Sequence, residues 1–130
     1  MKFPAANISI SHWNKEEDYL LYILENEFIY NPDNELYQQY FFNNLFVDSN
    51  GDIYKLIDRK LPSKIIQLFS FIPNLCKVEF IFKKTEDKMT LEQVRQHMLN
   101  QIEQLADDQN KVDWLHTIKN ATSFEKIIFG

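Results

Sequence analysis

The chain has 130 residues, 45% of them hydrophobic and 25% charged, which predicts one globular domain over residues 1–130 and is too apolar for a disordered segment. With only two glycines, neither a GxGxxG nor a GxxxxGKS/T phosphate loop can be written. The net charge is −5, and residues 1–57 hold nine acidic residues and only three basic ones. Such an acidic half repels the phosphate backbone of nucleic acid, so we expect no nucleic-acid partner.

The N-terminal residues predict a strand followed by a helix. Hydrophobic residues alternate with polar ones in NISISHW, residues 7–13, which indicates a short strand. Asn14 then stands three residues before Glu17, the spacing of a helix N-cap and its capping-box partner. Acidic residues crowd the next turn, and an apolar stripe recurs at helical spacing at Leu20, Ile23, Leu24 and Phe28. We therefore expect a helix over residues 16–30.

A proline limits the length of the first predicted helix. Pro32 disfavours helical geometry at the residue before it, so the first helix must end by Asn31. Residues 33–44 fit either a short helix or an irregular segment.

The segment FVDSNGDIYKLID, residues 46–58, resembles the start of a calcium loop because oxygen side chains recur at Asp48, Asn50 and Asp52. An EF-hand loop that began at Asp48 would need glycine at the position of Ile53 and glutamate at the position of Arg59. The alternative is a hairpin, since Asn-Gly is the preferred pair of a type I′ turn and apolar runs flank it on both sides. We predict two strands joined by a type I′ turn at Asn50-Gly51, and no metal site.

The middle of the chain contains one ambiguous run and one clear strand. Residues 65–72, IIQLFSFI, fit a helix by their spacing, whereas their β-branched and aromatic content narrowly favours a strand. Residues 76–84, CKVEFIFKK, alternate and predict a strand, with Val78, Phe80 and Phe82 on one face.

The last third predicts two to three helices. Thr90 and Gln93 form a capping box, and an apolar stripe follows at Leu91, Val94, Met98, Ile102 and Leu105. A second helix is predicted after the polar residues 107–110, and a third short one after a cap at Thr122. The fold class predicted is α+β: a small, mainly antiparallel sheet with an N-terminal helix and two to three C-terminal helices packed on one of its faces.

No catalytic constellation appears in the sequence. The three histidines, His12, His97 and His116, form no metal-binding array, and the serines lie in strand, turn or capping contexts without a nucleophile motif. The single cysteine, Cys76, fits a small apolar core residue better than a nucleophile. We therefore expect a non-enzymatic protein without cofactor or metal.

Tyrosine is unevenly distributed along the chain. All six tyrosines fall within residues 19–54, which is also the acidic zone. Tyrosine is enriched at the centres of protein interfaces, and neighbouring carboxylates steer a basic partner. The predicted partner-binding residues are Glu16, Glu17, Asp18, Tyr19, Tyr22, Asp33, Glu35, Tyr37 and Tyr40. The alternative is that these tyrosines belong to the fold.

The function predicted is a protein–protein interaction in which this acidic, tyrosine-rich face captures a basic protein. Small acidic α+β domains without motifs serve as immunity proteins and antitoxins, so the partner expected is a basic, nuclease-like cognate toxin domain. The toxin inhibitor would occlude the active site and imitate the phosphates that the toxin binds.

The alternative function is a self-associating structural or regulatory module, a homodimer that uses Phe41, Phe42 and the last helices. Residues 1–13 have no apolar core typical of a secretory peptide, and no run approaches the length of a membrane helix. With one cysteine and no internal disulfide, the simplest expectation is a cytoplasmic protein without a membrane partner.

Overall fold

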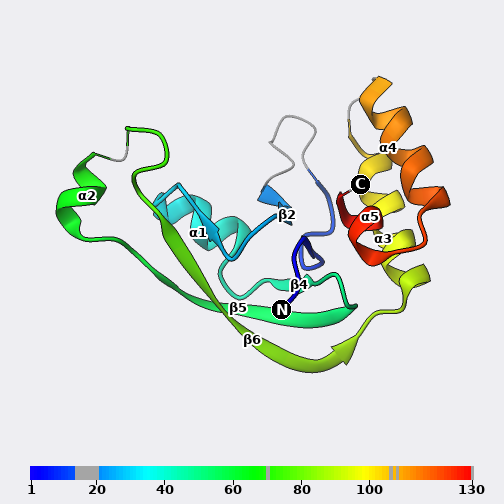
Figure 1. The fold of residues 1–130 in the computed structure, drawn as a ribbon, viewed down its shortest axis with the longest axis horizontal. Helices are drawn as coiled ribbons and strands as arrows, with labels where there is room; N and C mark the ends of the chain where they lie inside the picture. Colours follow the sequence, from blue (N-terminus) through cyan, green and yellow to red (C-terminus); the bar gives the residue numbers. More distant parts are fainter. Residues whose placement is uncertain (14–20, 70, 106, 108, 130) are drawn as a thin grey trace.

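The computed structural model describes residues 1–13, 21–69, 71–105, 107 and 109–129. Within these ranges, an antiparallel sheet of six strands runs in the order β2-β1-β4-β5-β6-β3 (Figure 1). The strands are β1 (Ala5–Asn7), β2 (Ile23–Leu24), β3 (Phe28–Ile29), β4 (Leu45–Val47), β5 (Asp52–Lys60) and β6 (Val78–Lys88). The helices are α1 (Asn34–Tyr40), α2 (Lys64–Leu68), α3 (Leu91–Glu103), α4 (Gln109–Asn120) and α5 (Phe124–Phe129). The predicted α+β class is confirmed.

The sheet curls so that its two edges approach each other. β2 and β3 occupy opposite edges, yet only residues 25–27 separate them in the chain. An extended chain from Leu24 to Phe28 spans at most about 14 Å. The short connection therefore holds the two edges close together.

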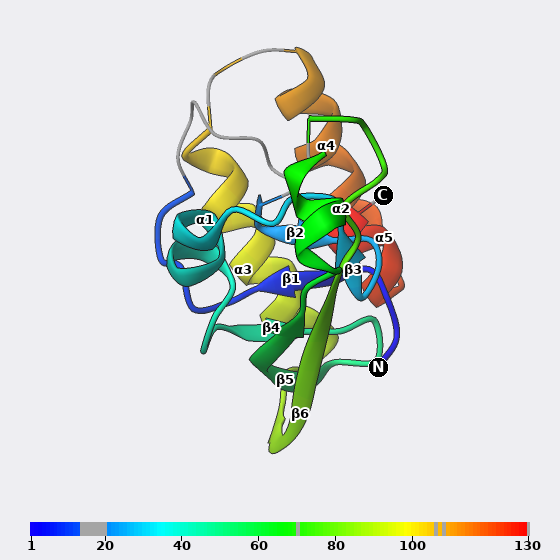
Figure 2. The same ribbon diagram turned by 90° about the vertical axis from the view of Figure 1, so that its left-hand side faces the viewer.

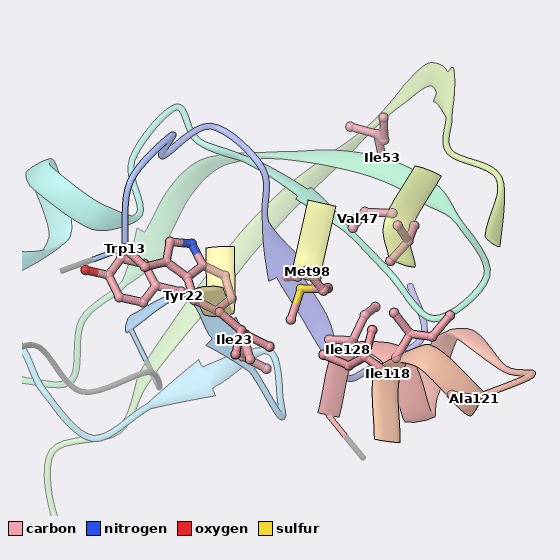
Figure 3. Close-up of a cluster of buried hydrophobic side chains, with 13 residues drawn as sticks. Trp13, Tyr22, Ile23, Val47, Ile53, Met98, Ile118, Ala121 and Ile128 are labelled. Atoms are coloured by element: carbon pink, nitrogen blue, oxygen red, sulfur yellow. The ribbon is translucent and has the colours of Figure 1, made fainter. Parts of the chain in front are cut away.

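Helices cover both faces of the sheet, whereas the sequence predicted helices on one face. Successive strand residues point to opposite faces, and neighbours such as Ala5 and Ala6, or Phe46 and Val47, fall into two different buried clusters. The first cluster joins the sheet to α3, α4 and α5 through Met98, Ile118 and Ile128 (Figure 3). The second joins it to α1. The sheet is thus the middle layer of the molecule.

The strand predicted over residues 7–13 ends earlier, at Asn7. The buried Asn7 side chain accepts hydrogen bonds from the backbone N–H groups of Ser9 and Ile10 at 2.8 and 3.1 Å. These bonds turn the chain out of the sheet, because an asparagine side chain competes with the strand ladder for backbone donors.

The predicted helix over residues 16–30 is wrong for the part that the structure describes. Its first residues lie outside the described ranges, and residues 21–30 contain β2 and β3. Here Ile23 pairs with Ala6 and Ile29 pairs with Val78. Pairing with strands from other parts of the chain overrides the helical spacing of the apolar residues. The N-terminal helix is α1, capped by Asp33, whose Oδ1 accepts from Leu36 N at 2.9 Å.

The hairpin predicted around Asn50 is confirmed as β4 and β5, but its turn is not type I′. In the loop Ser49–Gly51, Gly51 has a φ of +83°, and Asn50 does not have a positive φ. This geometry is typical of a type I turn followed by a glycine bulge. The Asp48 Oδ1 accepts from the N–H groups of Asn50 and Asp52, which fixes that turn in place.

The ambiguous run 65–72 begins in a helix, against the narrow preference for a strand. α2 starts after Ser63, whose Oγ accepts from Ile66 N at 3.4 Å. No described strand pairs with this run, so its β-branched residues gain nothing from extension. In Figure 1, α2 lies at one end of the molecule and α3, α4 and α5 at the other.

The C-terminal elements follow the prediction closely. β6 extends the strand predicted from residue 76, and α3 begins with the Thr90–Gln93 capping box. Its stripe buries Val94, Met98 and Ile102. The last helix is capped by Ser123 Oγ, which accepts from Lys126 N, rather than by Thr122.

In the part of the chain that the structure describes, no helix combines the length and the apolar composition needed to cross a membrane.

Candidate functional site

The structure divides the predicted partner-binding residues into three groups. Glu16, Glu17, Asp18 and Tyr19 lie outside the described ranges. Asp33 and Glu35 are exposed, and Tyr40 is half-buried. Tyr22 and Tyr37 are core residues, with exposed fractions of 1% and 6%. The predicted tyrosine-rich face is therefore largely part of the fold, and the residues that the structure leaves accessible are mainly acidic.

Tyr22 belongs to an aromatic stack between β2 and the N-terminal segment. Its ring lies parallel to that of Trp13, with 4.9 Å between the centroids (Figure 3). It also meets the Tyr40 ring edge-on, with 5.9 Å between the centroids. Such pairs stabilise a core by about 0.5–1.5 kcal/mol beyond simple burial.

Tyr37 holds α1 against the sheet. Its ring packs on Phe80 and Phe42, and the Arg59 guanidinium lies 4.2 Å from the ring centre. Burial raises the pKa of the Tyr37 hydroxyl, the Asp58 carboxylate raises it further, and Arg59 acts in the opposite direction. The phenol is a neutral core group that positions α1.

A groove of about 430 Å³ lies between the β2–β3 segment and α1. It opens where the two edges of the sheet approach, next to the residues that connect β2 to β3. Its walls are mainly apolar and include Leu21, Ile23, Phe28, Ile29, Leu36 and Phe41. An apolar hollow with a few polar groups is the usual form of a binding site.

One carboxylate lines this groove, and two others are close to it in the sequence. Glu25 lines it directly, and the exposed Glu27 and Glu35 are each next in sequence to a lining residue. Within the described residues, none of these three carboxylates has an ion-pair partner. Among the described residues, the cation in contact with a lining residue is Lys77, whose Nζ lies 4.2 Å from the Phe28 ring centre and 3.9 Å from Glu79 Oε1.

Tyr30 is an aromatic residue that lines the groove and remains partly exposed to solvent. Tyr30 is 43% exposed, lines the groove and contacts the Phe28 ring edge-on, with 5.6 Å between the centroids. A partly exposed tyrosine beside an apolar groove is a typical anchor for a protein partner. Among the described tyrosines, Tyr30 is the one with the exposed surface that such a contact needs.

The sequence interpretation missed the groove because it placed residues 16–30 on a helix. Glu25, Glu27 and Tyr30 were counted in the acidic and tyrosine-rich zone, but the pattern gave no reason to select them. The apolar pairs Ile23–Leu24 and Phe28–Ile29, separated by polar residues, were the available signal for two short strands.

In the segment that resembles a calcium loop, residues 46–58, the carboxylate of Asp48 is hydrogen-bonded to the protein backbone. Asp48 is fully buried; its Oδ1 accepts from two backbone N–H groups, and its Oδ2 accepts from Lys2 N at 2.9 Å. Asp52 instead lies within 4 Å of two lysines, Lys84 and Lys88. In the described ranges, no group of three or more His, Cys, Asp or Glu residues is arranged to hold a metal.

A second hollow, between α3 and α4, is bridged by a lysine. The largely buried Lys111 donates from Nζ to the carbonyl oxygens of Glu103 and Leu105 and to Asp107 Oδ1, at 2.8–3.1 Å. Carbonyls at a helix end lack partners within the helix, so this lysine closes the α3 terminus. Its role is structural.

The residues predicted for a homodimer differ in exposure. Phe41 is 1% exposed, and Phe42 is half-buried and packs on Tyr37. In the last two helices, Ile127 and Ile128 are fully buried, whereas Val112 and Phe129 are 58% and 37% exposed. A homodimer that uses Phe42 and the last helices stays a prediction.

No protein-family model, no curated protein and no solved structure matches this chain.

Proposed function

We propose that this chain is a non-enzymatic protein-binding module of the immunity or antitoxin type, which neutralises a basic, nuclease-like toxin. The observation that supports the proposal most directly is the groove beside the sheet edges. It combines an apolar lining with the carboxylates of Glu25, Glu27 and Glu35, none of which has an ion-pair partner among the described residues.

The chemistry of the groove suits a basic protein surface with one or two apolar side chains. Carboxylates at the rim attract such a partner and accelerate its arrival, while the apolar walls gain free energy when the partner displaces water. A nuclease surface is basic because it binds phosphates, and the groove carboxylates would take the place of those phosphates. Nucleic acid itself would be repelled.

The contact residues on this proposal are Glu25, Glu27, Tyr30, Asp33 and Glu35, all exposed. Tyr30 would supply the aromatic anchor at the centre. Glu16, Glu17, Asp18 and Tyr19 precede β2 in the chain and remain predictions from the sequence. The proposal places the protein in the cytoplasm, where a single unpaired cysteine is common and where a nuclease toxin acts.

The test uses the product of the gene directly upstream, where a cognate toxin domain would be encoded. Co-expression of the present chain should restore growth of cells that produce the toxin. Calorimetric titration should show tight binding that weakens as salt is added, because rim carboxylates are screened. Reversing the groove charges with Glu25→Lys, Glu27→Lys and Glu35→Lys should reduce the affinity by about a hundredfold or more.

A matched control changes the net charge by the same amount at a distance from the groove. Glu86→Lys, Asp87→Lys and Glu103→Lys replace three exposed acidic residues on β6 and α3. This variant should retain the affinity of the parent chain within a few-fold, apart from a change in long-range steering. Equal losses in both triple variants, or no loss in the groove variant, would refute the acidic-groove model.

Tyr30→Ala tests the apolar part of the contact without altering charge. Removal of a central tyrosine anchor should weaken binding by about tenfold or more. The circular dichroism spectrum should be unchanged, since the Tyr30 ring is 43% exposed.

A further inference from the structure

Between β5 and β6, residues 61–69 and 71–75 form an apolar arm, which includes α2. Large apolar side chains project from it into solvent: Ile65 is 71% exposed, Leu68 76% and Phe71 78%. Leu61, Phe69, Ile72 and Leu75 are each at least 40% exposed as well. Single surface hydrophobics are normal, but seven large exposed apolar side chains within fifteen residues, with the Phe69 and Phe71 ring centroids 6.2 Å apart, are typical of an interaction site.

Basic residues predominate on the arm and at its base, although Asp58 and Glu79 flank it and Lys77 pairs with Glu79 at 3.9 Å. Residues 59–77 contain four basic residues, Arg59, Lys60, Lys64 and Lys77, and no acidic residue. The molecule as a whole is acidic, with a net charge of −5. The partner of the arm is therefore expected to be apolar and acidic together.

The groove of the same protein has this complementary character. Its apolar walls match the apolar side chains of the arm. Glu25 lines it, and the exposed Glu27 and Glu35 are next in sequence to lining residues; none of the three has an ion-pair partner in the described ranges. We infer that the arm of one copy docks in the groove of a second copy, so that the protein forms a homodimer. This inference rests on the two surfaces and not on the proposed toxin partner.

The position of the two surfaces allows the contact to be reciprocal. Arg59, at the base of the arm, donates to Pro32 O and Asn34 Oδ1 at the start of α1, which is one wall of the groove. On the other strand, Val78 pairs with Ile29 of β3, which belongs to the opposite wall. The base of the arm therefore adjoins α1 and β3, which form two walls of the groove; Figure 2 turns the end of the molecule that carries α2 toward the viewer.

A two-fold dimer requires one continuous surface that is complementary to itself. Arm and groove together meet this requirement, and each dimer would contain two identical arm-in-groove contacts. An anionic membrane is an alternative partner for the apolar and basic arm. It would not suit the carboxylates near the groove, because its negative charge would repel them. A second copy uses both surfaces and satisfies both charges.

The oligomeric state of the full chain is the first test, measured by light scattering and by sedimentation at micromolar concentrations. The parent chain should have the mass of a dimer. The double variant Leu68→Asp and Phe71→Asp should be a monomer with an unchanged circular dichroism spectrum, because both side chains are more than three-quarters exposed. The control Val112→Asp, an exposed apolar residue on α4, should remain a dimer.

The second test locates the contact. Isotopically labelled and unlabelled copies are mixed and treated with a zero-length reagent that joins lysine to carboxylate. Mass spectrometry should find links between copies from Lys60 or Lys64 to Glu25, Glu27 or Glu35. The triple variant Glu25→Lys, Glu27→Lys and Glu35→Lys should be monomeric, and an arm with Lys60→Glu and Lys64→Glu should restore association with it.

Several outcomes would overturn the inference. These are a monomeric parent chain, a dimer that persists in the Leu68→Asp and Phe71→Asp variant, or links between copies that avoid the groove. Arm-dependent sedimentation of a monomer with phosphatidylglycerol vesicles would assign the arm to lipid instead. If the chain forms the dimer but binds no toxin, only the proposed function is contradicted. If it forms the dimer and also binds the toxin, the toxin and the second copy should compete for the groove.

Discussion

The guanidinium of Arg59 lies over the Tyr37 ring, 4.2 Å from its centre, and donates at the same time to Pro32 O at 3.2 Å and Asn34 Oδ1 at 3.1 Å. One side chain thus joins β5 to the start and to the buried face of α1. Because α1 forms a wall of the groove, Arg59 connects the base of the arm with the candidate site.

Arg59→Ala should lower the free energy of unfolding by about 1–2 kcal/mol, since it removes a cation–π contact and two hydrogen bonds to α1. Arg59→Lys should recover less than half of the loss, because an ammonium group cannot reproduce the fork geometry. Urea denaturation measures both, and Lys60→Ala, an exposed neighbour, is the control. If Arg59→Ala were as stable as Lys60→Ala, the contacts of Arg59 between β5 and α1 would contribute nothing to the free energy of unfolding.

Gly51 should tolerate no side chain. Its φ of +83° is strained for other residues, and a Cβ there would lie 2.5 Å from the Met89 carbonyl oxygen and 2.9 Å from Cζ of the Phe124 ring. Gly51→Ala should therefore destabilise the fold by roughly 2–4 kcal/mol. Thermal or urea unfolding measures this change. Asn50→Ala, at an exposed position of the same turn, should cost less than 1 kcal/mol by comparison, on the order of an ordinary surface substitution.

Asp48 is predicted to be a structural residue with no role in calcium binding. Asp48→Asn replaces one of two accepting oxygens by a donor, which then opposes a backbone N–H of Lys2, Asn50 or Asp52. The expected loss of stability is about 1–3 kcal/mol. Asp87→Asn, at an exposed site on β6, is the control.

The same Asp48 geometry predicts that millimolar calcium or a chelator leaves the unfolding temperature unchanged. Both carboxylate oxygens already accept hydrogen bonds from the backbone. A calcium-dependent rise in the melting temperature of the parent chain, absent in Asp48→Asn, would restore the metal-loop interpretation.

His97 should make the stability of the protein depend on pH. Burial lowers the pKa of His97 from 6.5, and the hydrogen bond between its Nε2 and the Asn7 carbonyl opposes this shift only in part. The folded protein therefore binds fewer protons at this site than the unfolded chain does. Its contribution to stability is complete above the unfolded pKa of 6.5 and is lost as the pH falls through that value toward the lower folded pKa.

The corresponding measurement compares melting temperatures at about pH 7.5 and about pH 5.5. The parent chain should lose more stability over this interval than His97→Gln, whose amide retains a donor but does not titrate. His116→Gln, at an exposed position on α4, should show the same loss as the parent. An identical pH dependence in His97→Gln would exclude a contribution from His97.

The sequence alone predicted the elements whose signals are local. The Thr90–Gln93 capping box and the stripe at Val94, Met98 and Ile102 specify α3 within a few residues, and strict alternation specifies β6. Asn-Gly between apolar runs predicted the β4–β5 hairpin. The type of its turn was missed because the Asp48 side chain, and not the Asn50 backbone preference, determines it.

The elements that the sequence misassigned depend on partners far away in the chain. β2 and β3 have the apolar spacing of a helix, and only pairing with β1 and β6 makes them strands. The tyrosine cluster shows the same limit. Composition revealed the gathering of Tyr22, Tyr37 and Tyr30 in one region, but not that the first two are buried and the third exposed.

The sequence by itself thus determined the α+β class, the C-terminal helices, the hairpin and the acidity of the N-terminal half, since these follow from short-range periodicity and from composition. Only the tertiary structure decided which residues are accessible. It buried Tyr22 and Tyr37 and left Tyr30 exposed, formed a mainly apolar groove lined by Glu25 between the β2–β3 segment and α1, and exposed the apolar side chains of the arm. The physical reason is that burial depends on which distant strands pair, and pairing is a property of the whole chain.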